Sequence, residues 1–247
     1  FMGFGLILTI LLVAGFIYLL NGRGANVNDL ISPAGKEYML KILLMPMFLN
    51  GKVAEVHGIS KDVTAMRRTE KIIVEKSRFL EVNAAFVSSL LENEINDKAL
   101  QETFAVIAET VEADRMYYFG ADKVNGEILI SQKVEWCSKL AVPQIDNVDL
   151  QDMPIKKVEE ITAPLIKNLP FKAVLSGLED GALKEIFLEQ DIKSMLLLPI
   201  FLQDQLFGFV GFDDCKSERI WKEEEISFLK SLTQNLTNAF EKREALE

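Results

Sequence analysis

Histidine is almost absent from this chain, which has one histidine, His57, in 247 residues. This scarcity excludes metal sites built on several histidines, and it excludes a cysteine–histidine catalytic pair in the region after residue 58. Cysteine is also scarce, because Cys137 and Cys215 are the only two, so we do not expect a disulfide scaffold. Neither the phosphate-binding pattern GxxxxGK[ST] nor the dinucleotide-binding pattern GxGxxG occurs. We therefore predict no metal site and no catalytic residue.

Positive charge is also in deficit. The chain has 27 lysines and arginines against 37 aspartates and glutamates, for a net charge of −10. Phosphates would be repelled overall, so we expect no nucleic-acid partner. The hydrophobic content of 49% is high for a chain that is soluble throughout, and the surplus is concentrated at its start.

Residues 1–20 read FMGFGLILTILLVAGFIYLL and contain no charged side chain. A helix of about 20 apolar residues spans the hydrocarbon core of a bilayer, about 30 Å. Arg23, Lys36 and Lys41 follow, and positive flanks favour the cytoplasmic side. We predict a transmembrane helix over residues 1–22, an inner (cytoplasmic) membrane location, and cytoplasmic placement of all that follows. A signal peptide and a buried core helix are the alternatives.

Two strand-like runs between residues 37 and 63 flank Asn50-Gly51, a strong short hairpin signal. Asp62 and Thr64 carry side-chain oxygens that can cap a following helix. The segment MPMFLNGKVAEVHGISKDVTAMRRTE resembles the last hairpin of a PAS domain and its exit. Residues 23–64 are too few for a whole PAS domain, so the resemblance implies a partial one without a ligand pocket.

Residues 65–96 are expected to form a helical linker, because Thr64 to Glu94 contains no glycine or proline. Its apolar residues recur at a spacing near seven, which is typical of a parallel coiled coil and predicts a homodimer. The alternative is a helix that packs on its own domain. The repeating residues are Ile72, Ile73, Phe79, Leu80, Phe86, Val87, Leu90 and Leu91.

The pattern changes again in the second half of the chain. Apolar runs from Ser194 and from Leu206 flank the polar turn Gln203-Asp204-Gln205, which predicts a hairpin. Glycines within the second run leave room for another backbone or a ligand. The segment from Ser217 to Glu225 is predicted to open a helix whose acidic start lies at Glu223, because the helix dipole favours negative charge in the first turns.

These elements resemble the C-terminal half of a GAF domain, the small sensory module of bacterial membrane-bound signalling proteins. The matching stretches are IKSMLLLPI, LFGFVGFDDC and RIWKEEEISFLKSLTQNLTNAF, with VEADRMYYFGAD and EILISQKVEWC upstream. The resemblance covers residues 97–240. It implies an α+β fold, with an antiparallel sheet of five or six strands flanked by helices. It also implies that the end helices pack on one face of the sheet and that any ligand pocket lies on the other.

Three aromatic side chains are our candidates for ligand contact: Tyr118, Trp136 and Phe171. Strand alternation sends part of the Tyr117-Tyr118-Phe119 run away from the core, and Trp136 stands at a strand end. The ligand itself is not identified. Bilin-binding GAF domains pair a cysteine with a nearby histidine, which this region lacks, so we interpret both cysteines as structural. Asp213-Asp214 is interpreted as a turn or cap at the end of the sheet rather than a metal pair, because adjacent strand residues point to opposite faces.

The resemblance implies a sensory or regulatory module of a signal-transduction protein. It would bind a small molecule, or relay a conformational change, through helices to an output domain of the histidine kinase or diguanylate cyclase type. Residues 241–247 would begin the linker to that domain. We expect no enzyme activity in this chain itself. The alternatives are a ligand-free dimerisation scaffold and a GAF-fold enzyme with redox-active cysteines.

Overall fold

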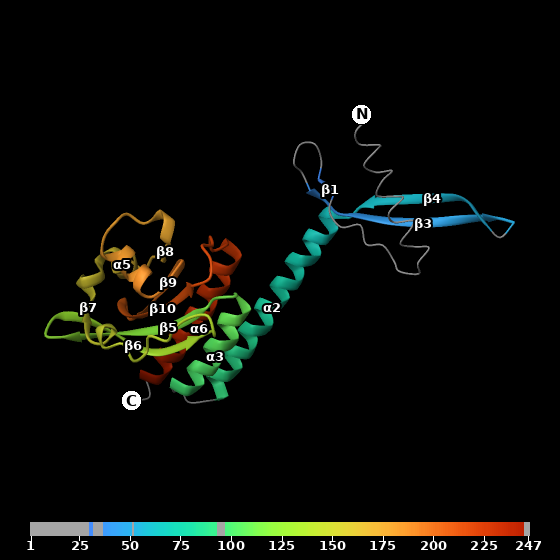
Figure 1. Cartoon of the computed structure of the whole chain (residues 1–247). Coiled ribbons are helices and arrows are strands. Elements are labelled where there is room, and N and C mark those ends of the chain that lie inside the picture. Colours follow the sequence, from blue (N-terminus) through green and yellow to red (C-terminus); the bar gives the residue numbers. More distant parts are fainter. Residues whose placement is uncertain (1–29, 32–36, 51, 93–96, 245–247) are drawn as a thin grey trace. The chain divides into compact units, whose positions relative to one another are not determined.

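The computed structural model describes residues 30–31, 37–50, 52–92 and 97–244. The chain divides into two compact units, Phe1–Lys76 and Ser77–Glu247 (Figure 1). The predicted membrane segment, residues 1–22, lies outside the described residues. Within the described ranges, no helix combines the length and the apolar character needed to cross a membrane.

The first unit contains the predicted hairpin. β3 (Leu40–Leu49) pairs antiparallel with β4 (Lys52–Asp62), and Asn50 has φ of 52° at the turn. The short strands β1 (Leu30–Ile31) and β2 (Glu37–Tyr38) also pair. A single hairpin does not identify a PAS domain, so that resemblance stays a prediction.

The predicted cap after this hairpin is present. The Asp62 carboxylate accepts hydrogen bonds from the backbone N–H of Thr64 at 2.9 Å and from its hydroxyl at 2.6 Å. The Thr64 hydroxyl in turn accepts from the backbone N–H of Met39 at 2.8 Å. These bonds fix the start of α2 (Thr64–Glu92), the predicted linker helix.

The second unit is built on a six-stranded antiparallel sheet in the order β7-β6-β5-β10-β9-β8. The predicted α+β class and strand number are therefore confirmed. Two tight hairpins turn at Asn125-Gly126 and Gln203-Asp204, where all four residues have positive φ, as mirror-image turns require. The strands are β5 (Arg115–Val124), β6 (Glu127–Cys137), β7 (Met153–Pro154), β8 (Phe171–Val174), β9 (Ser194–Leu202) and β10 (Gln205–Asp214).

One face of the sheet is covered by α3 (Asp97–Thr110), α6 (Glu223–Glu244) and the part of α2 from Ser77 onward (Figure 1). The rings of Phe79 on α2 and Phe228 on α6 stack with centroids 4.3 Å apart. Asn235 donates to Asn83 at 2.8 Å. This part of α2 therefore packs on its own domain, which is the alternative to the coiled coil that the spacing predicts.

The opposite face carries α4 (Glu159–Ile166), α5 (Ala182–Glu189) and short 3-10 turns at Val148–Leu150, Ile155–Val158 and Leu175–Gly177. Alternation along β5 divides its aromatic residues, because Tyr117 and Phe119 join the apolar cluster on this face while Tyr118 joins the cluster under the helices. The sheet thus separates two cores.

Candidate functional site

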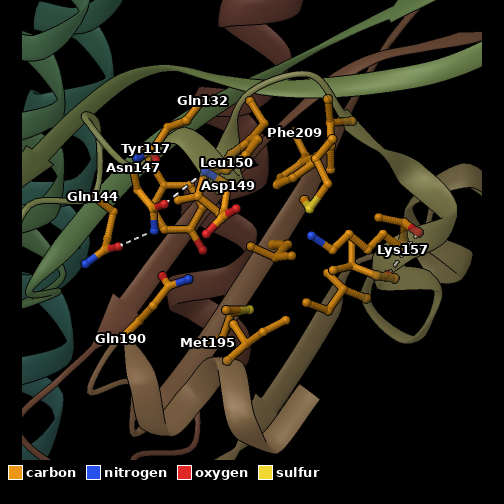
Figure 2. A pocket seen from close by; sticks show the side chains of 18 of the residues that line it. Tyr117, Gln132, Gln144, Asn147, Asp149, Leu150, Lys157, Gln190, Met195 and Phe209 are labelled. Atoms are coloured by element: carbon orange, nitrogen blue, oxygen red, sulfur yellow. Dashed lines mark hydrogen bonds between the residues drawn. The ribbon is translucent and has the colours of Figure 1, made fainter. Parts of the chain in front are cut away.

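A cavity of about 410 Å³ lies between the sheet and the α4–α5 side of the domain. Its floor comes from β5, β6, β9 and β10, and its cover comes from residues 144–162 and from α5. In Figure 2 the amides of Gln144, Asn147 and Gln190 lie on one side and Phe209 lies on the opposite side, while Met195 also lines the cavity. The cavity therefore has a polar half and an apolar half.

Arg115 forms the centre of the polar half and is only 1% exposed. One of its terminal nitrogens lies 3.1 Å from Asp213 Oδ2, and its Nε lies 3.5 Å from Glu135 Oε1. Burial opposes its charge, but negative neighbours led by Asp213 outweigh burial and raise the pKa of Arg115. The polar half of the cavity therefore contains a buried cation, Arg115, flanked by the buried carboxyl groups of Asp213 and Glu135.

Tyr117 completes this cluster by donating its hydroxyl to Asp213 Oδ1 at 3.1 Å. Burial raises the pKa of Tyr117 well above its usual value, and Asp213 adds to the effect. Burial also raises the pKa of Asp213 from 3.8 to about 7, against the opposing influence of Arg115 and of the Tyr117 hydrogen bond. Asp213 is therefore poised to change its charge near neutral pH.

The ring of Tyr117 needs Gly211, its cross-strand partner on β10. A Cβ at position 211 would come within 2.1 Å of a carbon of that ring. The space predicted beside this glycine is thus occupied by an aromatic side chain of the domain itself. It is the close approach at Gly211 that lets the Tyr117 hydroxyl reach Asp213.

A β-bulge at Lys133 decides which residues of β6 face the cavity. The register shifts there, so Tyr118 pairs with Val134 and Phe119 pairs with Gln132. Without the extra residue, Gln132 and Glu135 would point to opposite faces, because their separation of three breaks the two-residue alternation. With it, both line the cavity.

Glu135 also holds part of the cavity's cover. Its Oε2 accepts hydrogen bonds from the backbone N–H groups of Gln144 at 2.7 Å and Ile145 at 2.9 Å. The following segment is fixed by Asn147, whose side chain accepts from the N–H of Asp149 and donates to Gln144 (Figure 2). One carboxylate therefore bridges the buried cation and the wall opposite the sheet.

The three predicted ligand contacts lie elsewhere. Tyr118 packs against Phe240 of α6, with centroids 5.2 Å apart, in the core under the helices. Trp136 packs against that same core, and Phe171 packs at the edge of the cavity-side cluster. None of the three lines the cavity. Tyr117 and Tyr118 point to opposite faces of the sheet, as strand alternation predicts. It is Tyr117, however, and not Tyr118, that lines the cavity.

The cysteines are poorly suited to chemistry. Burial, chiefly, raises the pKa of both Cys137 and Cys215 to about 12, so both remain thiols rather than nucleophilic thiolates. Among the described residues, no group of three or more metal-ligating side chains is present. The interpretation of the cysteines as structural agrees with this environment.

Asp213 and Asp214 point to opposite faces, as strand geometry predicts, but the interpretation of the pair as a turn or cap holds for Asp214 only. Asp213 faces the cavity cluster, whereas Asp214 Oδ1 accepts hydrogen bonds from the backbone N–H groups of Lys216 and Ser217. Asp114 reinforces the same loop by accepting from the N–H groups of Cys215 and Lys216. Adjacent residues on β10 thus connect the cavity cluster with the loop that leads to α6.

Arg219 fastens this loop to the end of α3. Its guanidinium donates to the carbonyl oxygen of Val111 at 2.7 Å and lies 3.8 Å from the ring centroid of Trp221. Its backbone N–H donates to the Ser194 hydroxyl at 2.7 Å. Arg219 therefore links the loop between β10 and α6 to the end of α3 and to the start of β9.

Sequence reasoning missed Arg115, Glu135 and Gln132 as cavity residues. The available signal was polar residues within strands that are otherwise apolar, which is unusual unless partners are present. That signal does not reveal the partners, because Arg115 and Asp213 are 98 positions apart.

This architecture, a six-stranded antiparallel sheet with end helices on one face and a cavity on the other, defines an α+β domain with a ligand-sized cavity. Residues 96–240 match the GAF domain family, and the chain belongs to that family. Two solved structures share the fold: a phycoerythrobilin-bound GAF domain and a phycocyanobilin-bound GAF domain, each from a cyanobacterial phytochrome. The first has a TM-score of 0.53 at 13% identity, covering 68% of this chain and 96% of that one. The second has a TM-score of 0.51 at 15% identity, covering 68% and 94%.

A curated relative is the methanogenesis regulatory histidine kinase FilI of Methanothrix harundinacea (strain 6Ac), which is 35% identical over 191 residues. The match covers 77% of this chain, which spans 21% of the relative's length. A match of 191 residues within a chain of 247 includes α2 wherever it begins, so this helix is shared together with at least part of the domain. Homology to a regulatory histidine kinase and the GAF fold agree with a sensory or regulatory role.

Proposed function

We propose that this chain is the input module of a signal-transduction protein, in which the cavity binds a small molecule and α2 and α6 carry the response to an output domain. The observation that carries the proposal is the adjacency of Asp213 and Asp214 on β10. The first belongs to the cavity cluster, and the second caps the loop that starts α6. A ligand that shifts the cluster would act directly on that loop.

The response would be a shift between two arrangements of the helices. A ligand produces such a shift only by as much as its affinities for the two arrangements differ. Arg219 supports this route because it ties the α6 loop to the end of α3. The stacked pair of Phe79 and Phe228 then joins α6 to α2.

The test uses the full 247-residue chain. Native mass spectrometry is expected to detect a small molecule that co-purifies with the protein. Alternatively, addition of a metabolite extract is expected to raise the melting temperature of the protein. Ala182→Trp, which places a bulky ring at the cavity rim, should abolish either signal. Ile220→Trp is the control, because Ile220 is 84% exposed and does not line the cavity. Identical behaviour of both variants and the wild type would contradict ligand binding.

A dimerisation scaffold is the second candidate function, favoured by one observation. Met66, Ile73 and Leu80 are 57%, 58% and 69% exposed and are spaced seven residues apart on α2. Such a stripe suits a parallel pairing of two α2 helices in a homodimer. Ile73→Glu should raise the dimer dissociation constant in sedimentation experiments, whereas Arg68→Glu, at an exposed position of the same helix, should not. A wild-type chain that sediments as a monomer would overturn the pairing.

A further inference from the structure

Gln132 has a buried polar atom on the cavity wall with no partner. The side chain lines the cavity and the residue is only 4% exposed, yet its Oε1 has no hydrogen-bond donor within the described residues. Leaving a buried acceptor unsatisfied costs on the order of 1–3 kcal/mol. Its cross-strand neighbour is Phe119, which offers no donor from its side chain. A ligand with an N–H or O–H group would remove this penalty.

Four of the five N–H groups of the cavity's buried cation, Arg115, are engaged within the protein. The terminal nitrogens of Arg115 are engaged by Asp213, by the Val142 carbonyl oxygen at 3.0 Å, and by the side-chain and backbone oxygens of Gln190 at 3.5 and 3.3 Å. The fifth N–H, on Nε, lies 3.5 Å from Glu135 Oε1 in an ion pair, and neither of these two buried atoms has a hydrogen-bond partner among the described residues. A ligand carboxylate or phosphate that approached this N–H would lie beside the Glu135 carboxylate and be repelled by it.

Two hydroxyl donors in the wall are also used within the protein. The Tyr117 hydroxyl donates to Asp213. The Thr162 hydroxyl lies 3.0 Å from the carbonyl oxygen of Ile155 and 3.1 Å from that of Val158, so its hydrogen is taken by the protein.

Charge around the cavity is unfavourable to anions as well. The lining includes four acidic residues, Glu135, Asp149, Glu185 and Glu189, against two basic ones, Arg115 and Lys157. Arg115 and Glu135 pair with each other. This leaves Asp149, Glu185 and Glu189 against Lys157, and all four of these residues are exposed. Clefts lined by one sign of charge attract ligands of the opposite sign.

The apolar half accepts a flat body. The rings of Phe119 and Phe209 stack with centroids 4.9 Å apart and an interplanar angle of 8°. Met195, Leu197 and Ile130 continue this surface. An aromatic or alicyclic group would bury apolar area there while its polar end reached Gln132.

We propose that the cavity selects a neutral or cationic ligand with a flat apolar body and a hydrogen-bond donor for Gln132 Oε1, and that it discriminates against anions. The inference rests on the proposed ligand-binding function and names the chemical class of that ligand.

Three probes of one shape test the proposal: 2-(aminomethyl)naphthalene as the cation, 2-naphthamide as the neutral donor, and 2-naphthoate as the anion. Calorimetric titration into the full chain at neutral pH should give the amine and the amide dissociation constants at least about tenfold below that of the naphthoate. Tenfold is about 1.4 kcal/mol, the size of one hydrogen bond to an otherwise unsatisfied group.

Gln132→Met keeps the side-chain volume and removes the acceptor. It should weaken the amine and the amide by about tenfold and leave the naphthoate unchanged. Gln205→Met, at an exposed position outside the cavity, is the control. Glu189→Lys should reduce the preference for the amine over the naphthoate.

The outcomes separate the two proposals. Naphthoate binding as tightly as the amine, or an unchanged preference in Gln132→Met, would overturn the ligand class while ligand binding itself stood. Failure of all three probes to bind at millimolar concentration would overturn the ligand class, whereas the proposed function is decided separately by the mass-spectrometry and melting experiments with Ala182→Trp.

Discussion

Replacing Arg115 by methionine tests the buried charge cluster. The substitution preserves much of the side-chain volume but leaves Asp213 and Glu135, both 5% exposed or less, without their cation. Breaking a buried ion pair from one side costs about 3–5 kcal/mol. For a chain of this size that corresponds to a loss of about 10 °C in melting temperature.

Urea unfolding of the full chain, followed by tryptophan fluorescence, measures the effect. Both tryptophans, Trp136 and Trp221, lie in the GAF domain, so the signal reports on this unit. The destabilisation by Arg115→Met should be larger at pH 8 than at pH 5.5. The reason is that the pKa of Asp213 is already raised to about 7 and rises further once Arg115 is gone, so at pH 5.5 a proton neutralises the carboxyl group.

Two comparisons make this prediction refutable. Adding Asp213→Asn to Arg115→Met should recover part of the loss, since it removes one uncompensated charge. Lys172→Met breaks the exposed ion pair of Lys172 with Glu223, at 3.7 Å, and should cost less than about 1 kcal/mol. A cost for Arg115→Met as small as that for Lys172→Met, or a double variant no more stable than the single one, would refute the reasoning.

Three further predictions concern the site and its helices. Because the pKa of Asp213 is raised from 3.8 to about 7, its contribution to stability is present below about pH 4 and is lost as the pH rises through about 7. Asp213→Asn should therefore flatten the dependence of unfolding free energy on pH in that window, whereas the exposed Asp122→Asn should not. Gly211→Ala should lower the free energy of unfolding by about 1–3 kcal/mol through overpacking against Tyr117. Gly181→Ala is the control and should be neutral, because a Cβ at that position meets nothing within 4 Å. Equal effects of the two substitutions would exclude the close approach of Gly211 to the Tyr117 ring. Phe79→Ala should speed hydrogen exchange in the second half of α2 without affecting β9 and β10, and unchanged exchange would show that the stack with α6 is dispensable.

Local features of this domain could be predicted because they depend on near neighbours in the chain. Asn-Gly at 125–126 and the polar pair at 203–204 adopt positive φ, so they define hairpins wherever they occur between apolar runs. The helices from Thr64 and Glu223 follow from periodicity and capping. The likeness to a GAF domain rested on the order of such elements.

The site depended on information that is not local. Strand alternation predicts that Tyr117 and Tyr118 point to opposite faces of the sheet. It does not predict which face holds the cavity, because that depends on which face is covered by α3 and α6 and which by α4 and α5. The bulge at Lys133 then shifts the alternation of side chains along β6 by one residue, so that Gln132 and Glu135 point to the same face of the sheet.

The amino-acid sequence by itself determined the strands, the turns, the helices and hence the class of fold, since each depends on interactions within a few residues. Tertiary structure alone decided that Arg115 meets a carboxylate 98 positions away. It also decided that a glycine on β10 admits the ring of Tyr117. The physical reason is that burial makes charge pairing obligatory, while only the packed sheet selects the partner.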